Sequence, residues 1–177
     1  MNGRRDFFRD ALVLLGSFVG LTQMSSMSVA GEDKKPLIED ANGAALWVAG
    51  KLHDSGYKAD FSLASIPHVE RFLDENADLG KAKPRGLLAG DHGPRLFALA
   101  GYLGETWRRA GSGTWDAPVT DAPPHLQDFE LAILFPNGVR GWPGRAIVVR
   151  FFNGKEAGDL TVVTRALASQ GAFKWEQ

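Results

Sequence analysis

The chain of 177 residues contains no cysteine. Disulfide bonds, thiolate zinc sites, iron–sulfur clusters and thiol nucleophiles are therefore excluded. Basic residues are not in excess either, because 20 Lys and Arg stand against 21 Asp and Glu. Since no basic stripe runs along the chain, we do not expect the protein to bind nucleic acid.

Histidine is scarce, and its spacing does not suit a metal site. The four histidines are His53, His68, His92 and His125. No two of them are four residues apart on one expected helix, and no His-Glu-x-x-His sequence occurs. A site assembled from remote positions is the alternative. We therefore expect no metal ion and no other cofactor.

The N-terminal segment has an apolar run, but a short one. Residues 11–21 are apolar apart from Gly and Ser, whereas a membrane span requires about 20 such residues. The residues before this run resemble the twin-arginine export signal of bacteria at Arg4, Arg5, Phe7 and Phe8. The resemblance implies delivery of a folded protein through the twin-arginine machinery, with no permanent membrane span.

Small residues at the end of this segment complete the export pattern. Ser28 and Ala30 occupy the −3 and −1 positions of a cleavage site after Ala30. We expect a signal peptide over residues 1–30 and a periplasmic or secreted mature chain; an uncleaved anchor or a surface helix is the alternative. Residues 31–39 then form a flexible leader, and residues 40–177 form a single domain.

The central helical pattern covers residues 94–109. Apolar residues recur there at three- and four-residue steps, and Pro94 suits the first turn. Gly101 and Gly104 each cost a helix about 1 kcal/mol relative to alanine. Their pairing therefore predicts that another backbone crosses this helix closely. Glu105 precedes two arginines by three and four residues, a spacing that favours ion pairs.

The other expected elements follow from periodicity and turn chemistry. They are helices over about 40–55, from Ser65 and from Asp159, strands at 57–61, 129–135 and 139–142, and loops at 81–93 and 115–127. Residues 144–152 are contested, because their Ile and Val favour a strand while Pro143 and Asn153-Gly154 favour a helix. We prefer the helix. The whole pattern predicts a single α+β domain of several helices packed on a small antiparallel sheet.

Three pieces of the sequence resemble one group of small bacterial domains of unknown function. They are Asp60-Phe61-Ser62 before the Ser65 helix, Gly101-Tyr102-Leu103-Gly104-Glu105, and Pro136-Asn137-Gly138 before Trp142-Pro143. In that group a YLGE-type helix precedes a hairpin and a proline-led segment. The resemblance covers about residues 40–167. It implies the fold and no catalytic residues, and the export signal is an addition to it.

Two places offer candidate chemistry. Asp91 and His92 lie on a Gly-flanked loop before a helix, where such a pair can orient a general base or bind an anion. Glu105, the one acid of a largely apolar helix, is a candidate acid or base with a shifted pKa. Each also has a structural interpretation: a capped loop for the pair, and an ion pair with Arg108 or Arg109 for the glutamate.

Tryptophans offer a binding surface without chemistry. Trp115 and Trp142 can line a groove for a small ligand or an envelope protein, although tryptophans more often pack in a core. We expect an exported, non-catalytic domain that binds a protein or a small ligand in the cell envelope. The alternative is a hydrolase-like enzyme that uses Asp91, His92 and Glu105. A cofactor carrier is suggested by the export route alone.

Overall fold

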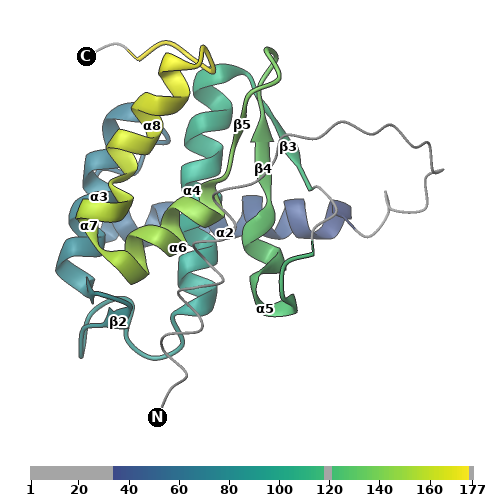
Figure 1. Ribbon diagram of the computed structural model, residues 1–177. Coiled ribbons are helices and arrows are strands. Elements are labelled where there is room, and N and C mark those ends of the chain that lie inside the picture. The colour runs from purple at the N-terminus through teal and green to yellow at the C-terminus, as the bar shows by residue number, and fades with distance from the viewer. Residues whose placement is uncertain (1–33, 118–120, 176–177) are drawn as a thin grey trace.

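The structure is a computed structural model that describes residues 34–117 and 121–175 (Figure 1). Within these residues, five helices of ten residues or more pack with two small antiparallel sheets into one body. The long helices are α2 (Lys34–Asp54), α3 (Ile66–Asn76), α4 (Gly93–Gly111), α6 (Pro143–Asn153) and α8 (Leu160–Ser169). The expected α+β fold, mostly helical and in a single body, is confirmed.

The expected signal peptide, residues 1–30, lies outside the described residues, together with Arg4, Arg5, Phe7, Phe8 and Ala30. The flexible leader expected over 31–39 is wrong in its second part, because α2 already includes Lys34. Apolar residues continue the α2 pattern backwards at Leu37 and Ile38, both half-buried, which extends the helix beyond the expected start. None of the described helices has the length and hydropathy that a membrane crossing requires.

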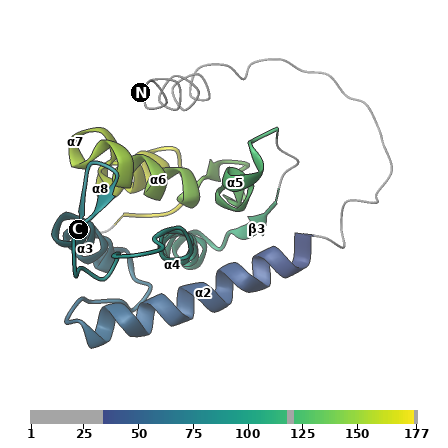
Figure 2. The same ribbon diagram turned by 90° about the horizontal axis from the view of Figure 1, so that it is seen from below.

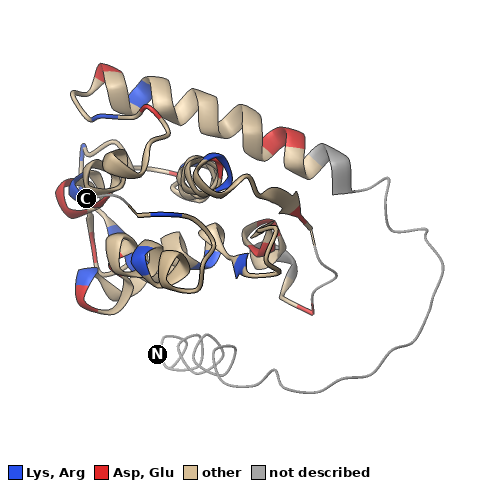
Figure 3. Ribbon diagram, turned by 90° about the horizontal axis from the view of Figure 1, so that it is seen from above, with Lys and Arg blue, Asp and Glu red and all other residues tan. Residues whose placement is uncertain are grey.

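Helix α4 lies in the middle of the body. Figure 2 shows α2 along one side of it and α6, α7 (Lys155–Gly158) and α8 on the opposite side. Basic and acidic residues are spread over all of these layers (Figure 3). Tyr102, Leu103 and Trp107 of α4 are fully buried, and the Trp107 indole donates to Thr164 Oγ1 at 3.0 Å. The helix predicted over 94–109 is thus the element on which both outer layers pack.

The close backbone crossing predicted from Gly101 and Gly104 is present at Gly101 only. A Cβ on Gly101 would lie 2.5 Å from the carbonyl oxygen of Ala41, so the α2 backbone crosses here as expected. A Cβ on Gly104 would instead overlap the indole ring of Trp115. One glycine therefore admits a backbone and the other admits a side chain.

The main sheet has the order β3 (Thr114–Asp116), β4 (Ala132–Leu134), β5 (Arg140–Gly141), all antiparallel. Trp115 pairs with Ile133, and Ile133 pairs with Gly141. The strand expected over 129–135 is shorter, because residues 128–130 form a 3-10 turn that directs the Glu130 carboxylate to Arg145. The turn predicted at 136–138 is confirmed: Gly138 has a φ of 85° and donates to the Phe135 carbonyl at 2.9 Å.

A second sheet was not expected. It is the hairpin of β1 (Ala77–Asp78) and β2 (Lys81–Ala82), and its turn residues Leu79 and Gly80 both have positive φ, as a type I′ turn requires. The loop expected at 81–93 therefore begins with the residues of β2. The loop expected at 115–127 begins with residues of β3 in the main sheet and also contains α5 (Pro124–Gln127).

Three further expectations have clear outcomes. Residues 144–152 are helical, as preferred, with Pro143 in the first turn of α6. Asp159 caps α8 by accepting a hydrogen bond from the Val162 N–H at 3.0 Å, as predicted. The strand expected at 57–61 is wrong, because the Phe61 N–H donates to the Tyr102 hydroxyl at 3.1 Å and joins no ladder.

Candidate functional site

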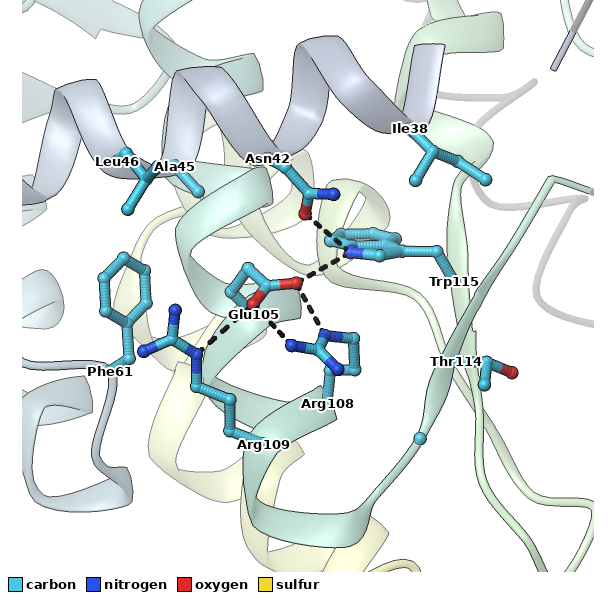
Figure 4. Close-up of a pocket in the computed structure, with 11 residues that line it drawn as sticks. Ile38, Asn42, Ala45, Leu46, Phe61, Glu105, Arg108, Arg109, Thr114 and Trp115 are labelled. Atoms are coloured by element: carbon cyan, nitrogen blue, oxygen red, sulfur yellow. Dashed lines mark hydrogen bonds and ion pairs between the residues drawn. The ribbon is translucent and has the colours of Figure 1, made fainter. Parts of the chain in front are cut away.

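A pocket of about 470 Å³ opens between the first half of α2, the last turns of α4 and strand β3 (Figure 4). Its lining comes from segments that are far apart in the sequence and that α4 brings together. The lining residues are Ile38, Asn42, Ala45, Leu46, Phe61, Glu105, Arg108, Arg109, Gly113, Thr114 and Trp115. Of the candidate site residues named from the sequence, this pocket contains Glu105 and Trp115.

The Glu105 carboxylate lies at the centre of the pocket with only 6% of the residue exposed (Figure 4). Its Oε1 accepts from Arg108 Nε at 2.7 Å and from the Trp115 indole N–H at 2.9 Å. Its Oε2 accepts from Arg108 Nη2 at 3.0 Å and from Arg109 Nε at 3.3 Å. A carboxylate offers about four acceptor positions, so these four bonds fill them.

The electrostatics of this carboxyl follow from the same contacts. Burial raises the pKa of Glu105, but the hydrogen bonds from Arg108 and Trp115 outweigh it, so the pKa lies below its ordinary value. The hydrogen bond to Glu105 raises the pKa of Arg108 in turn, against a smaller effect of burial. Glu105 is therefore ionised at neutral pH. The expected ion pair is present. The pKa of Glu105 is shifted downward, whereas a general acid requires a pKa shifted upward.

Arg108 and Arg109 have N–H groups that are not used in their hydrogen bonds to Glu105. Their side chains are 37% and 46% exposed, and each guanidinium carries five N–H groups. Arg108 directs two nitrogens to Glu105 and Arg109 directs one, and their other N–H groups have no partner among the described residues. The Arg109 guanidinium lies 4.0 Å from the Phe61 ring centroid, a cation–π contact.

Trp115 closes the side of the pocket formed by β3. Its indole N–H is shared between Glu105 and Asn42 Oδ1, the latter at 3.0 Å. The ring lies against α4 where Gly104 has no side chain. Gly104 is thus the residue that lets the indole reach Glu105, and the Glu105 network ties α4, β3 and α2 together.

Asp91 and His92 do not belong to this pocket. Both precede α4, where Asp91 Oδ1 accepts the Gly93 N–H at 3.3 Å and the His92 ring stacks on Phe151 at 5.1 Å. Glu105 follows His92 by thirteen residues along the helix, about 20 Å at 1.5 Å per residue. The structure therefore does not bring the three residues of the hydrolase hypothesis together.

Trp142 is also separate from the pocket. It immediately precedes α6, and the Arg145 guanidinium lies 4.3 Å from the centroid of its ring. Arg145 in turn donates to the buried Glu130. Trp142 thus packs against an ion pair and does not line this pocket, whereas Trp115 does.

Sequence reasoning missed Asn42 and Phe61 as pocket residues, and it assigned the two arginines only to ion pairing. Asn42 lies in α2, where no sequence motif marks it, and Phe61 lies in the segment expected to be a strand. The one local signal was Glu105 with its two arginines, because that spacing is set within a single helix. Which segments would cover the cluster depends on how α2 and β3 pack on α4.

Among the residues that the structure describes, no group of three or more His, Asp or Glu is arranged to hold a metal ion. Comparisons of the chain with protein-family models, with curated proteins and with solved structures found no match. The geometry of the pocket therefore carries the functional proposal.

Proposed function

We propose that this chain is an exported bacterial domain that binds a small ligand in the pocket around Glu105 and performs no chemistry on it. The observation that carries the proposal is the saturated Glu105 carboxylate. A general acid or base must exchange a proton with its substrate, and this group has a lowered pKa and no acceptor position left. What the pocket offers a ligand is a set of fixed contacts.

The shape of the site favours a small ligand over an envelope protein. The pocket is concave, its volume of about 470 Å³ lies within the range of small-molecule sites, and polar groups converge in it from three elements. A protein partner would use a broader and flatter surface. The hydrolase alternative has lost its geometric basis, since Asp91 and His92 lie at the other end of α4 from Glu105.

Export remains part of the proposal because of the N-terminal pattern. Changing Arg4 and Arg5 together to Lys is expected to leave the precursor in the cytoplasm, measured by cell fractionation and immunoblotting. Delivery of the double variant to the periplasm at the wild-type level would contradict the twin-arginine interpretation.

The proposed lack of catalytic activity is tested on the exported protein. We expect no turnover of esterase, phosphatase, glycosidase or peptidase substrates by wild type, and the same result for Glu105→Gln and His92→Ala. Circular dichroism confirms that each variant is folded. Turnover by wild type that Glu105→Gln abolishes in a folded protein would replace the binding proposal with an enzymatic one.

A further inference from the structure

We propose that the ligand of this pocket is an organic anion: an oxyanion head, carboxylate or phosphate, attached to an apolar body. This inference rests on the proposed function and adds the chemical class of the ligand. It follows from three properties of the pocket, namely its unused hydrogen-bonding groups, its charge and its walls.

The unused side-chain hydrogen-bonding groups of the Glu105 cluster are donors. The carboxylate has accepted four bonds, and the indole N–H of Trp115 is already shared. Asn42 must direct its oxygen to that indole, because an indole can only donate, which leaves the amide N–H groups of Asn42 over. The remaining N–H groups of Arg108 and Arg109 add to them. A ligand that supplies acceptors satisfies all of these groups.

The net charge of the pocket lining also favours an anion. Two arginines and one glutamate are the charged residues of the lining, so the pocket carries one net positive charge. The side chains of Arg108 and Arg109 line the pocket and are 37% and 46% exposed, and a planar guanidinium matches an oxyanion with two parallel bonds. An anion would neutralise the site and would take up the donors.

The apolar walls of the pocket favour a ligand that has an apolar part besides its anionic head. Ile38, Ala45 and Leu46 of α2 form one wall, and the rings of Phe61 and Trp115 flank the arginines (Figure 4). Leu46 is 63% exposed although it lies at the edge of a pocket. An apolar body placed against Leu46 and Phe61 removes this surface from water while the head lies at Arg108 and Arg109.

The test separates head from body with four probes: octanoate, octyl phosphate and octanol share an eight-carbon body, and acetate is a carboxylate head without that body. Binding is measured by isothermal titration calorimetry and by the shift of the Trp115 indole N–H resonance, assigned with Trp115→Phe. We expect at least one octyl anion to bind at least tenfold more tightly than octanol and than acetate. The preference over octanol should fall as salt rises.

The residue assigned to the head is tested with Arg109→Gln, because Arg109 gives Glu105 only one of its four bonds and its loss leaves the other three. We expect Arg109→Gln to weaken anion binding at least tenfold without changing octanol binding. Arg165→Gln is the matched control, since Arg165 is exposed on α8 near Trp175 and away from the pocket. It should bind as wild type does.

Each outcome decides something different. If octanol binds as tightly as both anions and shifts Trp115, the anionic class is wrong while the pocket is still a binding site. If none of the four probes binds, the class assigned here is wrong. If the anions bind but the Glu105-dependent turnover described above is found, the non-catalytic proposal fails and the anion remains as substrate.

Discussion

The buried pair of Glu70 and Arg150 and the open cluster of Glu105 with Arg108 and Arg109 use the same two residue types in opposite ways. Glu70 and Arg150 have side chains 4% and 5% exposed, and Arg150 Nε lies 2.6 Å from Glu70 Oε2 across 80 residues of sequence. The open cluster is made within two turns of one helix, and its arginine side chains are more than one third exposed.

The difference lies in where the donors are directed. Arg150 also donates to Asp74, and Glu70 also accepts the backbone N–H of Leu160, so this pair joins α3, α6 and the start of α8. The arginines of the open cluster direct part of their N–H groups to Glu105 and leave the rest at a pocket. The buried pair therefore uses its donors and acceptors to join three helices, whereas the arginines of the open cluster keep N–H groups that a ligand can use.

The largest expected effect comes from breaking the buried pair. Glu70→Gln leaves Arg150 buried with a partly exposed Asp74 as its remaining anion, so we expect a loss of about 3 kcal/mol in the free energy of unfolding. Urea denaturation measures it. Asp116→Asn is the matched control, since Asp116 pairs with the exposed Arg140 at 3.0 Å and should cost less than about 1 kcal/mol. Equal losses in the two variants would remove the distinction between the clusters.

The second-largest expected loss of stability concerns the close contact between α4 and α2, which places α2 over the open cluster. Gly101→Ala puts a Cβ 2.5 Å from the Ala41 carbonyl oxygen, and a backbone atom cannot move aside as a side chain can. We expect a loss of about 2 kcal/mol through overpacking. The control is Gly50→Ala in α2, where a Cβ meets nothing within 4 Å and the change should stabilise the helix by about 0.5–1 kcal/mol. A neutral Gly101→Ala would mean that α2 can shift on α4.

The two clusters also differ in how far the sequence predicts them. The ion pair of Glu105 follows from spacing within one helix, and the glycine pair correctly predicts close contact at Gly101. The pairing of Glu70 with Arg150 has no local signal, because the partners are brought together by the packing of α3 on α6. The strand expected at 57–61 fails for the same reason, since the Tyr102 hydroxyl takes the N–H of Phe61 that a ladder would have used. The sequence therefore predicts the spacing within α4 and that another segment crosses it closely, but not which segments meet.

The smallest expected effect is the removal of the Glu105 charge, and its dependence on pH gives it a distinct signature. Glu105→Gln keeps the shape of the side chain and weakens its bonds to two partly exposed arginines, so we expect a loss of about 1 kcal/mol near pH 7. The pKa of Glu105 in the folded protein lies below its ordinary value of 4.5, so the unfolded chain binds this proton more readily. The stabilisation by the ionised carboxylate is therefore complete above about pH 4.5 and is lost as the pH falls through the lower, native value.

The difference in unfolding free energy between wild type and Glu105→Gln should shrink over that interval, measured by urea denaturation at pH 7 and at steps below pH 5. Glu156→Gln, an exposed glutamate in α7, is the control and should follow wild type throughout. A difference that stays constant down to pH 3 would show that the charge of Glu105 does not stabilise the open cluster.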